Sequence, residues 1–232
     1  MIDVRAFAEL GAANHGWLDA HHHFSFASYH DPRRMGWGRL RVWNDDVIAA
    51  NSGFPPHPHN DMEIITYIRS GAITHRDSQG NVGRTAAGDV QVMSAGTGII
   101  HSEFNLESEE TRLFQIWIMP DVRGATPAWG TRPFPKQDRD GRFVVLASGF
   151  AEDTEALPIN AQARVAGATV KAGQSLDYRL GKARKAYLVP ATGAVEIEGV
   201  RVNSRDGAAI SESDIIHIQA VEDSELVLVD VA

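Results

Sequence analysis

Short apolar runs separated by turn-forming residues recur from one end of the chain to the other. The runs are rich in β-branched and aromatic residues, and several alternate apolar with polar positions. They lie at residues 46–48, 62–68, 89–93, 113–119, 142–146, 186–189, 194–198 and 225–231. Many short strands at regular spacing indicate a β-sandwich or a β-barrel. No long window has the periodicity of an amphipathic helix, so the pattern predicts an all-β fold with few, short helices.

An internal repeat divides this pattern into two halves. The first copy begins at Tyr67 and has turn glycines at positions 71, 80 and 88. The second copy begins at Tyr187 and has turn glycines at positions 193, 199 and 207. Both copies have the order strand, glycine turn, strand, glycine turn, strand. We therefore predict two related antiparallel β-barrels rather than one large barrel.

The stretch 120–135 separates the two halves. It is rich in proline, glycine and arginine and contains Trp129. Such a composition is typical of a connector that lies on the surface. We place the domain boundary between residues 120 and 145, with one domain at residues 1–130 and the other at residues 131–232.

The composition excludes several classes of site. With 232 residues, of which 43% are hydrophobic and 22% charged, the chain can bury a sizeable core. It has no cysteine, which excludes a disulfide scaffold, a zinc–thiolate site, an iron–sulfur cluster and a cysteine nucleophile. Any metal must then be held by histidine and carboxylate side chains.

The charge and the first residues of the sequence indicate which partners and which cellular location to expect. A formal net charge of -8 argues against direct binding to nucleic acid, whose phosphates require a basic face. No run approaches the roughly 18 apolar residues of a transmembrane helix, and the first residues lack the apolar core of a signal peptide. We expect a cytoplasmic monomer that does not enter membranes.

Two alternating pairs of polar residues form the main candidate site. His57 and His59 lie two positions apart and therefore share one face of an extended strand. His101 and Glu103 repeat this spacing. On strands that face each other across a barrel, the two pairs would supply three nitrogens and one oxygen. That set suits a divalent first-row metal and leaves coordination positions open. Glu63 has the parity of His57 and His59 and is a candidate fifth ligand.

The remaining histidines and the tryptophans have simpler interpretations. We expect His75 to be structural or solvated, and the run of histidines at 21–23 to lie on the surface or between domains. The C-terminal half has only His217 and no His-x-His pair, which indicates a barrel without metal. Most tryptophans are expected in the core, and one or two could line a pocket for a flat ligand; they are Trp17, Trp37, Trp43, Trp117 and Trp129.

Two segments of the N-terminal half resemble the paired motifs of the cupin superfamily. The segment 53–63, closed by Gly71, resembles the first motif, and the segment 88–101 resembles the second. Ser94 replaces a proline found in many cupins, and the interval from Gly96 to His101 is long. Both departures are shared with one branch, the bacterial pirins. Further segments that closely resemble pirins lie at residues 14–17, 24–26, 41–46, 57–63 and 93–103.

This resemblance covers nearly the whole chain and implies a specific architecture. The expected fold is a bicupin of two double-stranded β-helix barrels, with a metal in the N-terminal barrel only. The family pattern implies His57, His59, His101 and Glu103 as ligands and leaves Glu63 beside the site. It implies one divalent transition metal per chain, with iron as the first expectation and copper, nickel, manganese, cobalt and zinc as alternatives.

The resemblance also implies a reaction. Pirin-like proteins are associated with quercetin 2,3-dioxygenase activity, in which a metal-bound flavonol reacts with dioxygen and carbon monoxide is released. In this reading Glu103 is the general base that takes the flavonol hydroxyl proton. One alternative is a metal-binding regulatory protein that acts through protein partners. Another is a sugar-phosphate isomerase, for which Arg39 and Arg41 are the candidate phosphate ligands.

Overall fold

The computed structural model describes residues 1–232 and divides them into two compact units. The N-terminal barrel comprises Gly11–Phe134 and Leu157–Ala161. The C-terminal barrel comprises Met1–Leu10, Pro135–Ala156 and Gln162–Ala232. The chain therefore passes between the units several times, whereas the sequence prediction placed one boundary after residue 130. The reason is that strand pairing, which sequence patterning does not report, recruits the first residues of the chain into the second barrel.

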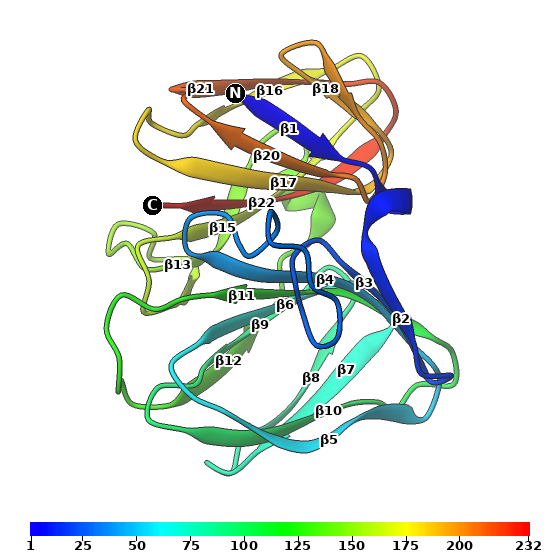
Figure 1. The fold of residues 1–232 in the computed structure, drawn as a ribbon, viewed down its shortest axis with the longest axis vertical. Coiled ribbons are helices and arrows are strands. Elements are labelled where there is room, and N and C mark those ends of the chain that lie inside the picture. Colours follow the sequence, from blue (N-terminus) through cyan, green and yellow to red (C-terminus); the bar gives the residue numbers. More distant parts are fainter. The chain divides into compact units, whose positions relative to one another are not determined.

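The N-terminal barrel is built from two antiparallel sheets (Figure 1). The larger sheet has the strand order β12-β9-β6-β11-β4-β3-β2, and the smaller has the order β5-β10-β7-β8. The strands are β2 (Gly11–Asn14), β3 (Leu18–His22), β4 (Leu40–Ile48), β5 (Ser52–His59), β6 (Glu63–Ser70), β7 (Ala72–Asp77), β8 (Val82–Ala86), β9 (Val90–Ser94), β10 (Ile99–Asn105), β11 (Thr111–Ile118) and β12 (Ala128–Arg132). The unit also includes the short β14 (Leu157–Pro158), which is not part of these two sheets.

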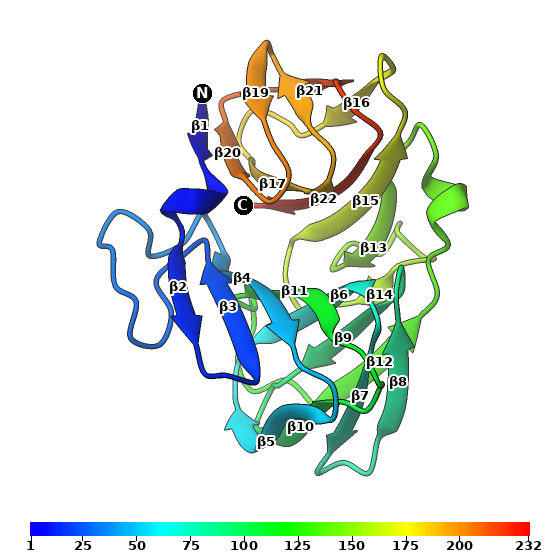
Figure 2. The same ribbon diagram turned by 90° about the vertical axis from the view of Figure 1, so that its right-hand side faces the viewer.

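The C-terminal barrel has the same plan. One sheet contains the order β1-β20-β17-β22-β15-β13, and the other has the order β16-β21-β18-β19. In Figure 2 these strands surround the interior of the barrel. The strands are β1 (Ile2–Arg5), β13 (Val144–Ser148), β15 (Arg164–Val170), β16 (Ser175–Arg179), β17 (Lys185–Thr192), β18 (Val195–Ile197), β19 (Val200–Val202), β20 (Gly207–Ser211), β21 (Ile215–Ala220) and β22 (Ser224–Val231).

The predicted fold class is confirmed. The only helices are two short 3-10 turns, η1 (Phe7–Glu9) and η2 (Lys136–Arg139). The two glycine-punctuated repeats are β6–β9 in the first barrel and β17–β20 in the second. The structure contains no helix with the length and hydropathy needed to span a bilayer.

The predicted surface connector at 120–135 is wrong in part, because it contains strand β12. This strand pairs with β9 in register Trp129↔Met93. The indole ring of Trp129 packs over Gly83, where a Cβ atom would come within 2.1 Å of the ring. Glycine at position 83 therefore makes room for Trp129, and the connector residues complete the sheet.

Candidate metal centre

Strands β5 and β10 bring the predicted ligands together as neighbours in one sheet. The two strands pair antiparallel, with His101 directly opposite His57. The expectation that the pairs face each other across a barrel is therefore wrong, because both lie on adjacent strands. A Cβ atom at Gly53 would lie 2.2 Å from the carbonyl oxygen of Glu103. The glycine that opens the motif thus permits the close approach of the two strands.

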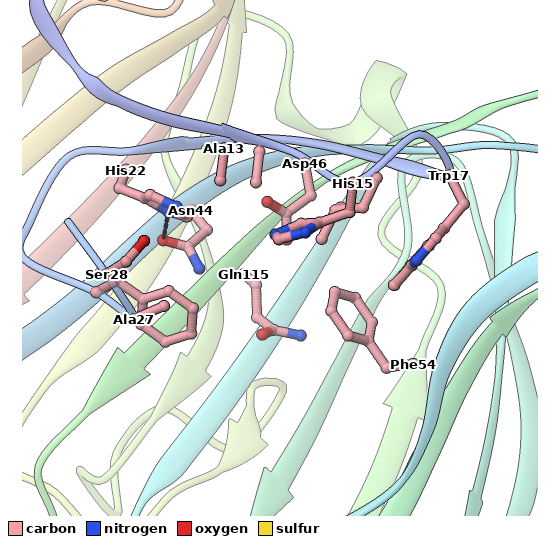
Figure 3. A pocket seen from close by; sticks show the side chains of 13 residues that line it. Ala13, His15, Trp17, His22, Ala27, Ser28, Asn44, Asp46, Phe54 and Gln115 are labelled. Atoms are coloured by element: carbon pink, nitrogen blue, oxygen red, sulfur yellow. Dashed lines mark hydrogen bonds between the residues drawn. The ribbon is translucent and has the colours of Figure 1, made fainter.

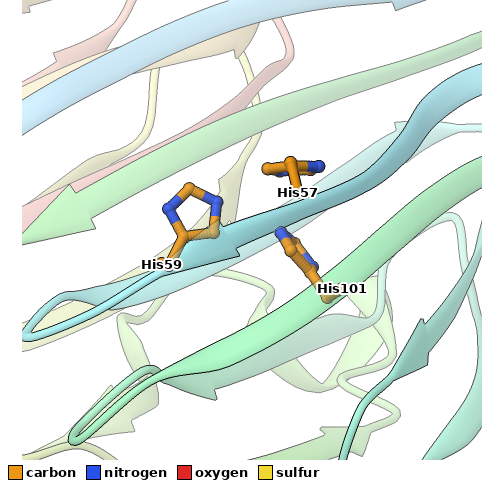
Figure 4. A group of neighbouring side chains, drawn as sticks. All are labelled: His57, His59 and His101. Carbon is orange, nitrogen blue, oxygen red and sulfur yellow. The ribbon is translucent and has the colours of Figure 1, made fainter.

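Three imidazole rings converge at this point (Figure 4). The ring centroids are 4.4 Å apart for His57 and His101, 4.9 Å for His57 and His59, and 5.0 Å for His59 and His101. One nitrogen from each ring lies within 4.8 Å of the others. His101 is buried, whereas His57 and His59 are half-buried. Three nitrogens at this spacing can bind a single ion and leave coordination positions open.

Hydrogen bonds orient two of these rings. His57 Nδ1 lies 2.8 Å from the carbonyl oxygen of Pro55, so Nδ1 carries the proton and Nε2 keeps a free lone pair. His101 Nδ1 lies 3.5 Å from His75 Nδ1, and His75 Nε2 lies 2.9 Å from Asp77 Oδ2. His101 Nε2 is buried and has no hydrogen-bond partner. A metal ion is a suitable partner for this unsatisfied nitrogen, so the donor set fits a divalent transition metal.

The surroundings keep the rings of His59 and His101 neutral. Burial, together with the neighbouring His57, lowers the pKa of His59 to about 4. Burial lowers the pKa of His101 to about 2, aided by His57, His59 and His75. Both rings are therefore unprotonated at neutral pH. Metal ions compete for the nitrogen lone pairs without having to displace protons there.

Glu103 lies beside the histidines at the centre of a buried hydrogen-bond network. Its Oε1 accepts from Gln91 Nε2 at 2.6 Å and from Thr66 Oγ1 at 3.3 Å. Its Oε2 accepts from Gln115 Nε2 at 2.7 Å. Burial raises the pKa of Glu103 to about 7, against the opposing effect of these hydrogen bonds. Glu103 can therefore exchange a proton near neutral pH.

The four predicted ligands do not form one compact group. His57, His59 and His101 form one cluster, and His75, His101 and Glu103 form a second, so that His101 is the shared member. The pairing register between β10 and β5 shifts between His101 and Glu103. The extra residue of this bulge lies on β5, between Phe54 and His57, whereas β10 keeps a regular register with β7. Glu103 therefore lies opposite His75 rather than opposite the His57–His59 pair.

His75 is the residue that sequence reasoning missed. It was expected to be structural or solvated, but it is fully buried. It lies opposite Glu103 on β7 and stacks on Trp129 with a centroid distance of 4.8 Å. The signal that could have found it is the spacing of His75 and Asp77, which repeats the alternation of the two predicted pairs.

Glu63 lies outside both clusters. Its carboxylate accepts a hydrogen bond from Ser94 Oγ at 2.6 Å and another from Asn160 Nδ2 at 3.3 Å. It lies on β6, in the larger sheet of the barrel. These contacts account for a buried carboxylate without a metal.

A cavity of about 410 Å³ lies within the N-terminal barrel (Figure 3). Gln115, which donates to Glu103, lines it, and so does Phe54, whose ring lies 6.2 Å from that of His57. Neither Arg39 nor Arg41 lines it. The complete lining is Ala13, His15, Trp17, Leu18, Ala20, His22, Phe26, Ala27, Ser28, Asn44, Asp46, Phe54 and Gln115.

Two expectations are resolved by this cavity. Trp17 lines it and meets Phe54 edge to face at 5.1 Å, so one of the tryptophans does line a pocket. That a flat ligand binds there stays a prediction. His22, from the run expected on the surface or between domains, is instead buried and bonded to Asn44 at 2.9 Å.

Comparisons with known proteins agree with this architecture. A pirin family model matches residues 3–118, and a model described as the quercetinase C-terminal cupin domain matches residues 145–231. The chain is 66% identical over 232 residues to a pirin-like protein of Caulobacter vibrioides, covering 100% of both chains. It is 45% identical over 231 residues to the quercetin 2,3-dioxygenase of Escherichia coli K12, covering 99% of this chain and 98% of that one.

A solved structure has the same fold over its full length. The bacterial pirin of Escherichia coli in complex with nickel(II) has a TM-score of 0.94 and 42% sequence identity, with coverage of 100% of this chain and 99% of that one. The family models and the names of the relatives support a cupin-type oxidoreductase. From the match to the family model and the high identity over the full length, the chain belongs to the pirin family.

Proposed function

We propose that this protein is a metal-dependent dioxygenase that cleaves the central ring of flavonols such as quercetin and releases carbon monoxide. The observation that carries this proposal is the juxtaposition of three converging imidazoles, the buried Glu103 and an aromatic-lined cavity. The name of the Escherichia coli relative supports the same substrate class.

His57, His59 and His101 are the proposed metal ligands, and Glu103 is the proposed fourth. One divalent transition metal per chain is expected, with iron tested first and copper, nickel, manganese, cobalt and zinc as alternatives. When bound, the ion would supply Lewis acidity toward the substrate oxygen and, if redox-active, a route for electrons to dioxygen. The unsatisfied His101 Nε2 and the neutral state of His59 and His101 support this assignment.

Glu103 is the proposed general base. Its carboxylate would accept the proton of the flavonol 3-hydroxyl, leaving the substrate as an electron-rich flavonolate. A pKa of about 7 suits this role, since the group can both accept and return a proton near neutral pH. Gln91 and Gln115 hold one carboxylate oxygen each and so fix its orientation. Gln115 also lines the cavity and connects the base to the place where a ligand would lie.

The cavity has the size and lining that a flat aromatic ligand requires. Its volume of about 410 Å³ is within the usual range for small-molecule sites. Trp17 and Phe54 form one aromatic wall. Phe26 contacts Trp117 edge to face at 5.4 Å, and Trp117 in turn contacts His59 at 4.9 Å. Aromatic contacts therefore extend from Phe26 in the cavity wall to the proposed ligand His59.

The direct test is turnover. Protein loaded separately with iron, copper, nickel and manganese is incubated with quercetin in air. Loss of the flavonol absorbance and release of carbon monoxide are followed together, with His57→Ala as the control. Metal-dependent turnover that disappears in the control is the expected result. No turnover with any fully loaded form would overturn the proposal, and a stable protein partner recovered with such a form would favour the regulatory alternative.

The role of Glu103 is tested separately. Glu103→Gln should abolish turnover while the protein still binds metal through its histidines. Full activity in a metal-loaded Gln variant would remove Glu103 from the role of base.

A further inference from the structure

Asp46 has a buried carboxyl group that the proposed reaction does not use. It lies on β4 with 2% of its surface exposed, and its Oδ1 has no hydrogen-bond partner in the protein. The side chain lines the cavity and points into it (Figure 3). The preceding residue, Asp45, has a different environment, because it forms an ion pair with Arg69.

An unpaired buried carboxyl group destabilises the folded state. Nearly all buried polar groups have partners, and one without a partner calls for an explanation. An apolar side chain of similar size would fill the same space without this cost. A partner that binds in the cavity is therefore the physical explanation that the position of Asp46 supports.

The electrostatic surroundings define what that partner is. Burial raises the pKa of Asp46 well above its usual range, and the nearby Asp45 and Glu103 raise it further. A neutral carboxyl group can both donate and accept a hydrogen bond. A hydroxyl group has the same two capacities and is the natural complement. A charged ligand group would gain no ion pair there.

The reacting oxygen is not this partner. Asp46 belongs to neither cluster of metal-ligating side chains, whereas the 3-hydroxyl must reach those clusters if Glu103 is the base. Two carboxyl groups in one barrel would therefore bind different oxygens of one ligand. The aromatic residues that share the cavity with Asp46, among them Trp17 and Phe54, suit a hydroxyl carried on a flat ring.

We propose that Asp46 is a positioning residue that hydrogen-bonds a ring hydroxyl of a planar, polyhydroxylated aromatic substrate, remote from the oxygen that reacts. This inference rests on the proposed function for the class of ligand. It adds that the protein distinguishes hydroxylated flavonols from unsubstituted ones through Asp46.

The test compares two ligands and two variants by isothermal titration calorimetry. The ligands are quercetin and 3-hydroxyflavone, which lacks the other ring hydroxyls. The full chain is loaded with zinc, which has no redox chemistry, so binding is measured without turnover. Asp46→Leu should weaken quercetin binding about tenfold, the loss expected for one hydrogen bond, and leave 3-hydroxyflavone within about threefold. Asp46→Asn, which keeps a donor and an acceptor, should retain most of the affinity for quercetin.

Thermal stability separates this role from a structural one. Asp46→Leu removes an unpaired polar group, so its Tm should equal or exceed that of the wild type while its affinity falls. Asp45→Asn is the matched control from the same strand. It breaks the ion pair with Arg69, so it should lower the Tm and leave both affinities unchanged.

The outcomes distinguish this inference from the proposed function. Equal affinity of the wild type and Asp46→Leu for quercetin would overturn the inference, as would an equal loss for both ligands. Selective loss of quercetin binding, together with no turnover by any redox-active metal form, would support the inference and overturn the dioxygenase proposal. A wild type that binds neither ligand would overturn both.

Discussion

The smaller sheets of the two barrels have the same arrangement of strands, but polar side chains line the interior of one barrel and apolar side chains that of the other. The smaller sheet has the order β5-β10-β7-β8 in the N-terminal barrel and β16-β21-β18-β19 in the C-terminal barrel, so β10 and β21 occupy corresponding places. Strand β10 carries the buried His101 and Glu103. Strand β21 carries Ile216 and Ile218, with 0% and 1% of their surfaces exposed. The sheet tolerates either set, because its backbone hydrogen bonds do not depend on the side chains between them.

The interiors differ accordingly in what stabilises them. A continuous apolar cluster, which includes Leu188, Ile197 and Leu228, fills the C-terminal barrel. In the N-terminal barrel, Gln91 links Thr66 to Glu103, and Gln115 holds the other carboxylate oxygen. Apolar burial stabilises the C-terminal barrel directly, whereas hydrogen bonds between buried polar side chains contribute to the stability of the N-terminal barrel. The comparison teaches that chemistry in this fold is set by a few inward-facing positions on one sheet.

The largest expected effect is the loss of metal from the N-terminal barrel. His101→Leu gives β10 the apolar character of β21 and removes the nitrogen shared by both clusters. Metal affinity should fall by at least about 100-fold, more than the loss of an outer contact to a ligand causes. The stability of the metal-free protein should change little, because removal of an unpaired buried nitrogen offsets the loss of the contact with His75. Metal content after dialysis and denaturant unfolding provide the two measurements, and full metal retention would contradict the assignment.

The reciprocal change is Ile218→His in the C-terminal barrel. It places an imidazole in the apolar cluster with no polar partner. The free energy of unfolding should fall by about 2–4 kcal/mol, and the protein should gain no metal. A stable variant that binds a second metal ion would show that the barrels are more alike than their interiors indicate.

A smaller effect is expected in the pH dependence of stability. Glu103 has a pKa of about 7 in the folded state, against an ordinary value of 4.5. Between these pH values the folded state holds a proton that the unfolded state has lost, so stability falls as the pH rises. Across this window the metal-free protein should lose roughly 3 kcal/mol relative to Glu103→Gln. Urea unfolding of both proteins from pH 4.5 to pH 8 measures the difference, and parallel curves would show that Glu103 is not strongly perturbed.

The smallest expected effect concerns His75, which contacts the proposed ligand His101. His75→Phe keeps a ring that can stack on Trp129 but removes the link from Asp77 to His101. Metal affinity should fall by about 10–100-fold. His217→Phe is the matched control, since His217 forms a similar bond with Asp177 at 2.8 Å on the exposed surface of the C-terminal barrel. Competition with a chelator measures the affinities, and equal values for the two variants would make His75 a packing residue only.

The sequence pattern predicted the fold well because alternating apolar and polar residues mark the strands, and glycines mark the turns between them. Strand β12 was not predicted, because it is short and has few apolar residues. It forms by pairing with β9, which the local sequence does not indicate. The proximity of His57 and His59 followed from their spacing. Their direct pairing with His101 did not, because register between distant segments is a property of the whole sheet.

The remaining features of the site depend on three-dimensional context that alternation cannot supply. Both faces of β7 carry polar residues, so the pattern could not show that His75 points inward. The bulge on β5 between Phe54 and His57 offsets Glu103 from the two histidines of that strand, and the alternation pattern does not predict this offset. The missing partner of Asp46 is visible only when all of its neighbours are known.

The pairing of strand β1 determines when the C-terminal barrel can be completed during translation. Residues Ile2–Arg5 are translated long before their partner β20, which lies at Gly207–Ser211, and the Met1 amine donates a hydrogen bond to the Ser211 carbonyl oxygen at 2.6 Å. Strand β1 must therefore remain unpaired until β20 has been translated. The N-terminal barrel in turn contains Leu157–Ala161, so neither barrel can be completed from the residues on one side of position 130. Separate expression of the two halves should therefore yield fragments with unpaired edges, which recover their structure only when both are present.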